Sequence, residues 1–400
     1  MKILIVNKFL YPNGGSETYI FKLGNELIRQ GHEVQYFGME HEGRIVGNHA
    51  EIYTNNMDFH TGKVQKLLYP FKIIYSTEAA GKMRKVLDDF QPDAVHLNNF
   101  NFQLTPSIIY AVKKHEKKSR KKIKLVYTAH DTQLVCPNHL MQNPFTLERC
   151  DACLKQGVSQ CARRSCIHGS RIKSLLGTIE AALYKKLKTY NKLDVIICPS
   201  DFLKKKLDTD MVLRQKTLLL RNFVDQKVQE REFTKKNYVL YLGRYSQEKG
   251  IKTLLRACAL LSDIPFHFAG NGPLEEEIRK VPNIKTCGFL EGDALTKEIA
   301  EARFVVFPSE CYENCPFTVM EAQVCHTPVL GSDLGGIPEL IEEGVTGELF
   351  ESGNADVLAR KIRTLWEQKD KLQVYTENCK NVKFDNVEEY TKKLLKIYAN

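Results

Sequence analysis

The stretch FVVFPSECYENCPFTVMEAQVCHTPVLGSDLGGIPELI, residues 304–341, decides the fold of this chain. It opens with the apolar run Phe304–Phe307, which has the length of a buried parallel strand. A polar loop at Pro308–Pro316 follows, then a helix expected from about Phe317 and a second short strand at Pro328–Leu330. This order of strand, loop, helix and strand is typical of a parallel α/β sheet.

Two carboxylates and a glycine pair stand where the loops of such a sheet meet. Glu313 lies in the loop and Glu321 in the first turns of the helix, while Gly335-Gly336 precedes a further helix expected from Ile337. Strand ends and helix N-termini present unpaired N–H groups and the positive end of a helix dipole at the carboxyl edge of the sheet. Phosphorylated ligands bind at this edge in open α/β sheets.

The spacing of Glu313 and Glu321 resembles the E-x7-E element of retaining glycosyltransferases of family 4, which have the GT-B fold. The resemblance implies that Glu313 hydrogen-bonds the donor sugar and that Glu321 holds the ribose of the nucleotide. Carboxylates suit polyols because each oxygen accepts from two hydroxyls. The structural alternative is that Thr318-Val-Met-Glu321 forms a helix capping box.

Two motifs in the first half of the chain match the same family. Gly14-Gly15 follows the strand Lys2–Val6 and resembles the family's GG-x-E element, in which the second glycine faces the donor diphosphate and the acceptor. It is not the G-x-G-x-x-G dinucleotide fingerprint, which argues against a dehydrogenase. His130 follows the strand Ile123–Tyr127, where the family has a histidine near the donor sugar; the alternative is a structural histidine.

Two further motifs lie in the second half. Arg244 and Lys249 follow the strand Tyr238–Leu242 in the loop Gly243–Gly250. An arginine fork and a lysine point charge can clamp a diphosphate, which is their role in the family; the alternative is two solvated charges. Gly288 and Phe289 lie where the family's backbone contacts the nucleobase.

The resemblance departs from the family after Glu313. The family commonly has a glycine-rich segment there, whereas this chain has Asn314-Cys315-Pro316-Phe317. Pro316 has no N–H group to donate, so the phosphate contacts are expected from neighbours such as Phe317 and Thr318. Asn314 is also expected to bind the donor. This difference leaves the identity of the donor open. It affects the expected reaction less.

The length of 400 residues suits two domains. The resemblance implies an α/β protein of the GT-B class: two Rossmann-like, doubly wound parallel-sheet domains facing a cleft. The expected boundaries are 1–222 for an acceptor-side domain with a cysteine-rich insertion at 136–168, 223–386 for a domain that binds the nucleotide sugar, and 387–400 for a helix crossing back. The polar segment Arg221–Asn237 is the expected linker.

Twelve cysteines in a chain of this size and class do not indicate disulfides. Five of them crowd between Cys136 and Cys166, and two close pairs give the spacing of a structural zinc knuckle, with Cys150, Cys153, Cys161 and Cys166 as the expected ligands. The alternatives are ligation by Cys136, His139 or His168, or reduced thiols without a metal.

The net charge is +10, and no apolar run reaches the length of a membrane span. The basic segment Arg171–Leu193 has an apolar stripe at helical spacing, which indicates either packing on the protein's own core or contact with an anionic membrane. No secretory signal is recognisable, so a cytoplasmic protein, peripheral at the inner face of the membrane, is expected.

The resemblance therefore implies a retaining hexosyltransferase. It would move sugar from a UDP- or GDP-sugar to a saccharide or lipid-linked acceptor, in surface polysaccharide or glycoconjugate assembly, without a catalytic metal. The alternatives are a GT-B sugar-nucleotide epimerase and a non-enzymatic protein using basic and zinc-knuckle surfaces. Nucleic acid is not an expected partner because the basic residues are not interleaved with aromatics.

Overall fold

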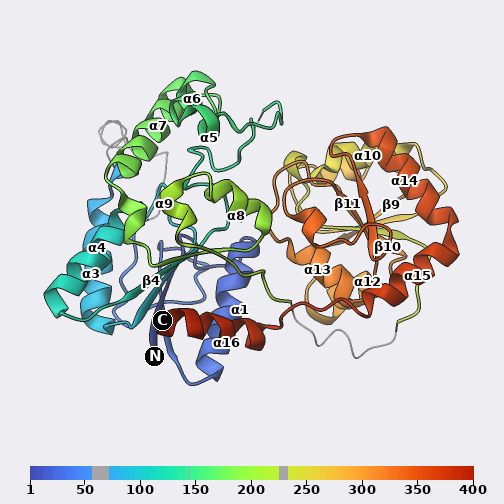
Figure 1. Ribbon diagram of the computed structural model, residues 1–400. Helices are drawn as coiled ribbons and strands as arrows, with labels where there is room; N and C mark the ends of the chain where they lie inside the picture. Colours follow the sequence, from blue (N-terminus) through green and yellow to red (C-terminus); the bar gives the residue numbers. More distant parts are fainter. Residues whose placement is uncertain (56–71, 144, 225–232) are drawn as a thin grey trace. The chain divides into compact units, whose positions relative to one another are not determined.

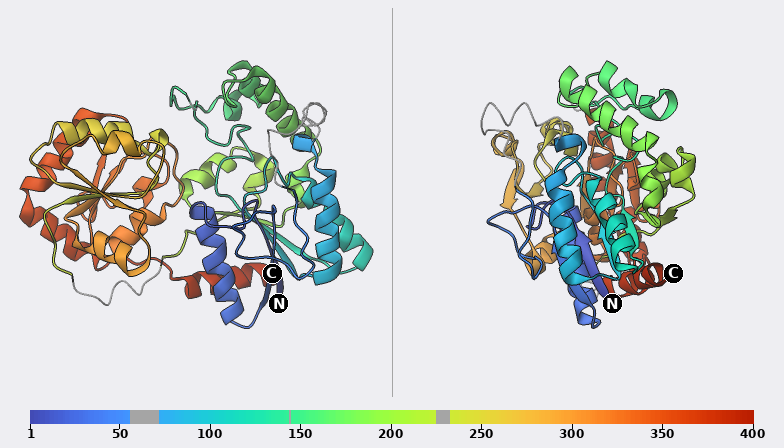
Figure 2. Two further views of the ribbon diagram at one scale, coloured as in Figure 1. Left: turned by 180° about the vertical axis from the view of Figure 1, so that it is seen from behind. Right: turned by 90° about the vertical axis from the view of Figure 1, so that its left-hand side faces the viewer.

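The computed structural model describes residues 1–55, 72–143, 145–224 and 233–400. The chain divides into two compact units: unit 1 consists of Met1–Arg221 and Val387–Asn400, and unit 2 of Asn222–Asn386. Each unit is built on a parallel six-stranded sheet with helices against it (Figure 1 and Figure 2). The predicted linker Arg221–Asn237 lies partly outside the described residues.

The sheet of unit 1 has the strand order β2-β1-β3-β4-β5-β6. Its strands are β1 (Lys2–Val6), β2 (Glu33–Phe37), β3 (Ala94–Leu97), β4 (Lys124–Thr128), β5 (Val195–Cys198) and β6 (Thr217–Leu219). Its helices are α1 (Gly15–Arg29), α3 (Thr77–Phe90), α4 (Ser107–Ser119), α5 (Ala152–Gln156), α6 (Ser159–Arg163), α7 (Arg171–Lys186), η1 (Thr189–Lys192), α8 (Asp201–Leu207), α9 (Met211–Arg214) and α16 (Val387–Ala399). Apolar residues of α3, α4 and α8 pack on one face of this sheet.

The sheet of unit 2 has the order β12-β11-β10-β7-β8-β9. Its strands are β7 (Val239–Leu242), β8 (Phe266–Ala269), β9 (Ile284–Gly288), β10 (Phe304–Phe307), β11 (Val329–Ser332) and β12 (Gly347–Phe350). Its helices are η3 (Gln247–Lys249), α10 (Ile251–Ala259), α11 (Glu275–Ile278), α12 (Gly292–Glu301), α13 (Phe317–Val324), η4 (Ile337–Glu339), α14 (Ala355–Glu367) and α15 (Lys369–Cys379). Helices α10, α14 and α15 cover one face, and α12 and α13 cover the other.

The doubly wound parallel sheets expected from the sequence are confirmed, with two local differences. The helix expected from Ile337 is only the short 3-10 turn η4, which has a proline in its first positions. The helix expected at Arg171–Leu193 ends at Lys186, because Lys188 takes a left-handed conformation before η1.

Helix α16 belongs to unit 1 and packs against α1. Its two buried tyrosines reach polar groups of the unit's interior. The Tyr390 hydroxyl lies 2.8 Å from the hydroxyl of Tyr19 on α1, and the Tyr398 hydroxyl lies 2.6 Å from Nδ1 of His96 on β3. Helix α16 thus completes a buried hydrogen-bond network inside unit 1.

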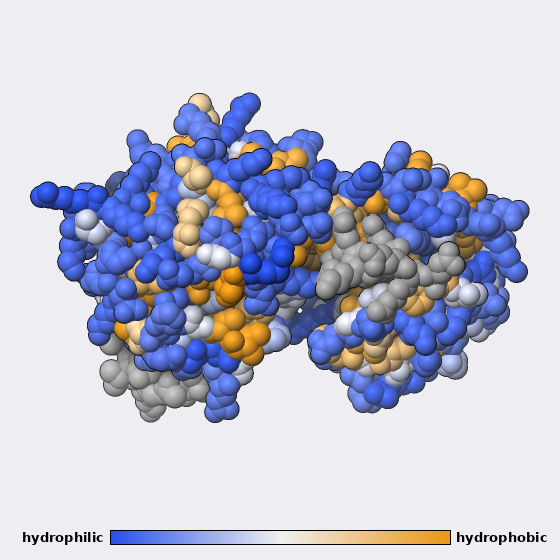
Figure 3. All heavy atoms as spheres, turned by 90° about the horizontal axis from the view of Figure 1, so that it is seen from below, coloured by the Kyte–Doolittle hydropathy of each residue, from blue (hydrophilic) through white to orange (hydrophobic). Residues whose placement is uncertain are grey.

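The surface agrees with the modest apolar content of the sequence. On the face seen in Figure 3, hydrophilic residues predominate and hydrophobic atoms form separate patches. Among the described residues, no helix combines the length and the apolar character that crossing a membrane requires.

Candidate active site

The carboxyl edge of the unit 2 sheet brings together Lys249 and Glu313, which are 64 residues apart in the chain. Nζ of Lys249 donates to Oε1 of Glu313 at 2.5 Å, and the Ser309 hydroxyl donates to the same oxygen at 2.9 Å. Burial disfavours the charge on Lys249, but the Glu313 carboxylate outweighs it, so the pKa of Lys249 is raised. Lys249 therefore stays a cation, and its side chain is still 31% exposed at the edge of the sheet.

The second carboxylate oxygen of Glu313 has a different environment. Every hydrogen bond that Glu313 accepts through its side chain from the described residues goes to Oε1, including the long contact from the Cys311 thiol at 3.7 Å. Oε2 is left to accept hydrogen bonds from a ligand such as a sugar. The side chain is thus oriented by its neighbours without being saturated by them.

Two glycines allow the loops of this edge to approach closely. Gly250 has φ +76°, and a Cβ there would lie 1.8 Å from the carbonyl oxygen of Pro308, just after β10. Gly335 has φ +64°, and a Cβ there would lie 2.5 Å from the carbonyl oxygen of Glu313. Both positions require glycine for backbone conformation and for space. The motif glycines Gly250 and Gly335 therefore fix the positions of Lys249 and Glu313.

Arg244 lies in the same loop as Lys249, between β7 and η3. Its carbonyl oxygen accepts a hydrogen bond from the Tyr241 hydroxyl at 2.8 Å and from the amide of Ser246 at 3.0 Å. The residue itself is exposed. The backbone of Arg244 is thus held by buried neighbours while its guanidinium side chain is accessible.

Helix α13 begins at Phe317, as the sequence predicts, and its N-cap is Pro316 without any side-chain cap. The alternative of a capping box at Thr318 and Glu321 is therefore wrong, because Thr318 is the second residue of the helix and not its cap. The amides of the first helical turn have no acceptor within the helix. Asn314, Phe317 and Thr318 accordingly stand at the positive end of α13, and Glu321 follows in its second turn.

Two supporting residues had no signal in the sequence. Ser309 donates to Glu313, and its carbonyl oxygen accepts from the Ser332 hydroxyl at 2.8 Å. Nδ2 of Asn222, at the start of unit 2, donates to the carbonyl oxygen of Cys315 at 3.0 Å. A serine and an asparagine in loops are too common for their roles to be read without the fold.

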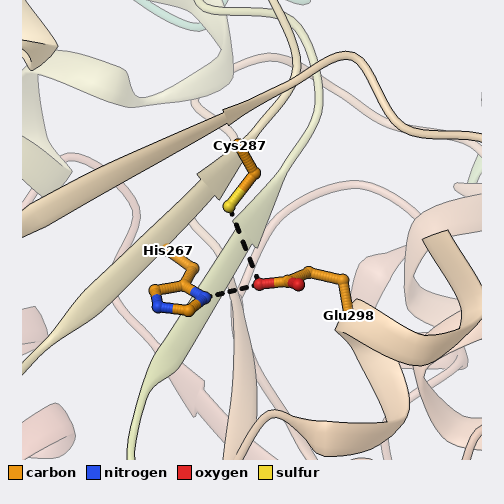
Figure 4. Close-up of side chains that lie close together, drawn as sticks. All are labelled: His267, Cys287 and Glu298. Atoms are coloured by element: carbon orange, nitrogen blue, oxygen red, sulfur yellow. Dashed lines mark hydrogen bonds and ion pairs between the residues drawn. The ribbon is translucent and has the colours of Figure 1, made fainter. Parts of the chain in front are cut away.

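Gly288 and Phe289 lie at the end of β9, next to a cluster of three side chains. His267, Cys287 and Glu298 point toward one another from β8, β9 and α12 (Figure 4). Nδ1 of His267 lies 2.5 Å from Oε1 of Glu298, and this hydrogen bond lowers the pKa of Glu298. The Cys287 thiol donates to the same oxygen at 3.7 Å.

Among the described residues, this cluster is the one group of three potential metal ligands whose ligand atoms all lie within 4.8 Å of one another. Its members already satisfy one another by hydrogen bonds, and the ring of Tyr238 stacks on His267 at 3.8 Å. It therefore serves as a brace for the end of β9. Phe289, directly after the brace, is 68% exposed.

The carboxyl edge of the unit 1 sheet carries His130, just after β4. Its Nε2 lies 2.9 Å from Oδ1 of Asn98, and its ring meets Tyr19 edge-on at 5.3 Å. The amide group of Asn98 faces backbone carbonyls, so Oδ1 accepts and Nε2 of His130 donates. Burial lowers the pKa of His130 to about 4, so the ring is neutral near pH 7 with Nδ1 as an acceptor.

Gly14 and Gly15 lie at the start of α1 in unit 1. Gly14 is the N-cap with φ −179°, an extended conformation that any residue adopts, and a Cβ there would be at an ordinary 3.6 Å from Glu17. Folding alone therefore does not require glycine at Gly14. Glu17 of the same motif is buried and accepts from Asn7 at 2.8 Å, so it anchors the loop.

We expect the buried histidines of unit 1 to make the protein acid-labile. Burial, with a contribution from His130, lowers the pKa of His96 to about 3. Each histidine binds a proton more readily when unfolded, so its stabilising contribution is complete above about pH 6.5 and is lost as the pH falls toward its folded pKa. The free energy of unfolding should fall by about 1.4 kcal/mol per pH unit for each histidine below pH 6.

Urea denaturation at pH 7.5 and at pH 5.0 measures this effect. His96→Gln keeps a hydrogen-bonding side chain but cannot be protonated, so its stability should change less between the two pH values than that of the wild type. His49→Gln, at an exposed position, is the matched control and should follow the wild type. Equal slopes for wild type and His96→Gln would show that His96 does not titrate during unfolding.

The predicted zinc ligands Cys150, Cys153, Cys161 and Cys166 line one small enclosed cavity in unit 1 together with Cys136. All twelve cysteines of the chain are free thiols. The Cys136 thiol donates to Oδ1 of Asn138 at 2.9 Å, and the Cys153 thiol donates to the carbonyl oxygen of Val158 at 3.9 Å.

The two histidines considered as alternative ligands do not line this cavity. His139 instead stacks on Phe102, with ring centroids 4.8 Å apart, and contacts Asn101. His168 is exposed.

Helix α7 presents its apolar stripe outward. Ile172 is 73% exposed and Leu175 52%, and the stripe continues with Ile179, Leu183 and Leu187. The buried residues of the helix are Ser174, Gly177 and Tyr184. The interpretation that this stripe packs on the protein's own core is therefore wrong.

Comparison with family models covers nearly the whole chain. Residues 13–228, more than half of the chain, match the model described as Glycosyltransferase Family 4. Residues 223–382 match the model described as Glycosyl transferases group 1.

Individual relatives match over shorter regions. An uncharacterised glycosyltransferase of Methanocaldococcus jannaschii is 28% identical over 222 residues, which are 54% of this chain and 61% of the relative. The amylovoran biosynthesis glycosyltransferase of Erwinia amylovora is 29% identical over 137 residues, 30% of this chain and 34% of the relative. The chain thus spans less than two thirds of the length of these curated relatives.

Among solved structures, the Anabaena protein HepE in complex with UDP superposes over the whole of both chains with a TM-score of 0.65 and 18% identity. This likeness shows the fold, and it agrees with the two parallel six-stranded sheets.

Proposed function

This chain belongs to glycosyltransferase family 4, and from that membership we propose that it moves a sugar from a nucleoside diphosphate sugar to an acceptor hydroxyl with retention of anomeric configuration. We propose that unit 2 binds the donor and unit 1 supplies the acceptor site. The observation that carries the proposal is the pairing of Lys249 with Glu313 at the carboxyl edge of the unit 2 sheet, beside the N-terminus of α13.

The roles of the unit 2 residues follow from the charge that develops during transfer. When the bond between the anomeric carbon and the diphosphate breaks, negative charge builds on the departing phosphate. Arg244, Lys249 and the first amides of α13 are the groups proposed to stabilise it, with Asn314, Phe317 and Thr318 at the helix end. Cations and a helix dipole supply this stabilisation without a metal ion.

The remaining residues position the substrate. Oε2 of Glu313 would accept hydrogen bonds from the donor sugar, and Glu321 from the ribose. His130 is proposed to lie near the donor sugar, as the histidine of the family does. Gly14 and Gly15 leave room for the diphosphate and the acceptor at the start of α1. Gly288 and Phe289, held by the brace at the end of β9, are proposed to contact the nucleobase.

We propose a UDP-hexose as the donor, with a GDP-hexose as the second candidate, because HepE, which shares the fold, binds UDP. Thermal unfolding with UDP, GDP and their sugars tests this choice. A nucleotide at a hundred times its dissociation constant should stabilise the protein by about 2.7 kcal/mol. A lack of stabilisation by every nucleotide would contradict the proposal.

Product analysis then separates transfer from epimerisation. Release of the nucleoside diphosphate that depends on an added saccharide or lipid-linked acceptor is the result expected of a transferase. Conversion of one sugar nucleotide into another without any acceptor would instead identify a GT-B epimerase.

We propose that the pathway is surface polysaccharide or glycoconjugate assembly on the cytoplasmic side of a membrane. One of the relatives is a glycosyltransferase of amylovoran biosynthesis, which agrees with a role in glycan assembly. The outward stripe of α7 supports contact with an anionic surface. Arg171, Lys173, Lys185, Lys186 and Lys188 are exposed beside it. An apolar face flanked by basic residues binds anionic lipid by burial and by charge together.

Flotation with vesicles of phosphatidylglycerol and phosphatidylcholine measures this contact. The wild type should float with the anionic vesicles, and Leu175→Gln/Ile179→Gln should reduce the bound fraction by about tenfold because two apolar anchors are lost. Met211→Gln, another exposed apolar residue outside the stripe, is the control. A wild type that stays at the bottom of the gradient would refute the membrane contact.

A further inference from the structure

The cysteine-rich part of unit 1 contains a small cavity that is lined mostly by cysteines. Five thiols line it, and Asn138, Met141 and Gln142 complete the wall. Three segments contribute the thiols: the loop after β4, the start of α5, and α6 with the residues after it. The thiols are Cys136, Cys150, Cys153, Cys161 and Cys166.

The segment around this cavity has almost no hydrophobic core of its own. In the described part of residues 136–170, the buried apolar side chains other than cysteine are Met141 and Ala152, whereas Leu140 and Phe145 are 45% and 62% exposed. Helices α5 and α6 have five residues each, too few for a stable isolated helix. A segment of this kind needs an additional cross-link to be stable, and the usual cross-links are a disulfide or a structural metal.

The charge of the segment favours the metal. Residues 136–170 contain four basic side chains and only two acidic ones. A Zn²⁺ ion with four thiolates carries a net charge of −2, which the surplus of basic residues compensates. The basic residues are Arg149, Lys155, Arg163 and Arg164, and the acidic residues are Glu148 and Asp151.

We propose that this cavity binds a structural Zn²⁺ ion through four thiolates, one of which is Cys136. Tetrahedral zinc takes four ligands at about 2.3 Å, so one of the five thiols is left outside the coordination sphere. His139 and His168 are not ligands, because neither lines the cavity. Four protein ligands fill the sphere, so the metal is structural and takes no part in the transfer step.

Ligation by Cys136 distinguishes this site from a zinc knuckle formed by the other four cysteines alone. Cys136 lies six residues after His130, and its amide donates to the carbonyl oxygen of Thr132 at 2.9 Å. Ligation by Cys136 would join the loop that carries His130 to the insertion. The zinc ion would then stabilise the edge of the unit 1 sheet as well as the insertion.

Zinc binding also requires the loops to move inward. Among the described residues, the ligand atoms of His267, Cys287 and Glu298 all lie within 4.8 Å of one another. No three sulfur atoms of the cysteine-lined cavity lie that close together. Structural zinc sites commonly form together with the fold around them, because the ion supplies folding free energy. The metal should therefore change the stability of the segment measurably.

Metal analysis of the untagged 400-residue chain, expressed with added zinc and purified without chelators, tests the proposal. We expect about one zinc per chain in the wild type. Cys136→Ser should fall below half an equivalent, and the control Cys198→Ala, a buried thiol in β5, should keep one. Less than half an equivalent in the wild type overturns the site, and full zinc content in Cys136→Ser overturns the role of Cys136.

A measurement on the wild type covers the case in which Cys136→Ser does not fold. Replacing the metal with Co²⁺ should produce the thiolate-to-cobalt charge-transfer band and the visible bands of a tetrahedral tetrathiolate site. A spectrum with fewer than four thiolates, or an octahedral one, contradicts the proposal. Both readouts are independent of sugar transfer, so they decide the metal site even where the proposed function fails.

Discussion

Replacing Lys249 with methionine should reduce the rate of sugar transfer by about 100- to 1000-fold, the size of effect seen when one preorganised charge-stabilising group is removed. Methionine keeps the length of the side chain and removes its charge, so the departing diphosphate loses one of its two proposed cations. Steady-state release of nucleoside diphosphate measures the loss. Lys252→Met, an exposed lysine on α10 three residues further on, is the matched control and should retain full activity.

Loss of Lys249 also leaves a half-buried carboxylate without its cation, and this effect must be separated from catalysis. The Glu313 side chain is only 16% exposed, so Lys249→Met should cost about 1–3 kcal/mol of stability. The double variant Lys249→Met/Glu313→Gln removes both charges and should regain most of that stability. Its transfer rate should stay low. A double variant that recovers activity would show that Lys249 acts only by neutralising Glu313.

Replacing Glu321 with alanine should weaken nucleotide binding by about 10- to 100-fold, because hydrogen bonds to a charged group contribute about 1.5–3 kcal/mol. The stabilisation by UDP or GDP in thermal unfolding should largely disappear at the concentration that stabilises the wild type. Glu276→Ala, an exposed glutamate on α11, is the control and should respond like the wild type.

Deoxynucleotides test whether Glu321 acts through the ribose. Wild type should bind UDP more tightly than 2′-deoxy-UDP or 3′-deoxy-UDP, and Glu321→Ala should bind UDP and at least one of these analogues equally well. If the variant still discriminates against both analogues to the same extent as the wild type, Glu321 does not contact the ribose.

The central strands of both sheets could be predicted from the sequence, and the edge strands of unit 2 could not. β1, β7 and β10 are continuous apolar runs because parallel strands inside a doubly wound sheet are buried on both faces. β9 and β12 form the two edges of the unit 2 sheet. β9 is half-exposed and reads IKTCG, so it lacks the apolar run by which a buried strand is recognised.

Only part of the candidate site, likewise, could be predicted from the sequence. Strand ends and glycines placed Lys249 and Glu313 at one edge, and the structure brings them into contact. The supports from Ser309 and Asn222 depend on which loops become neighbours, and a single sequence carries no such signal. The five-thiol cavity is an intermediate case, because the spacing identified four cysteines while the folded loop adds Cys136.

Helix α7 shows why periodicity does not reveal which face is buried. An apolar stripe usually faces the core, but here Ser174 and Gly177 face inward. A Cβ at Gly177 would lie 2.5 Å from Ile167, and the Ser174 hydroxyl accepts from the amide of Ile167 at 2.8 Å. The cysteine-rich insertion occupies the inner face of the helix and selects small residues there, so the stripe is turned outward.

The Tyr390 and Tyr398 hydroxyls on α16 also set the order in which the chain can fold during translation. Unit 1 holds residues from both ends of the chain, whereas unit 2 is continuous. Domains generally fold as they leave the ribosome, and unit 2 has every residue it needs once Asn386 has emerged. Tyr398 and Tyr390, the partners of His96 and Tyr19, follow Asn386 in the chain and leave the ribosome after it. The edge of the unit 1 sheet that carries His130 therefore completes its folding last, after the unit 2 sheet with Lys249 and Glu313 has formed.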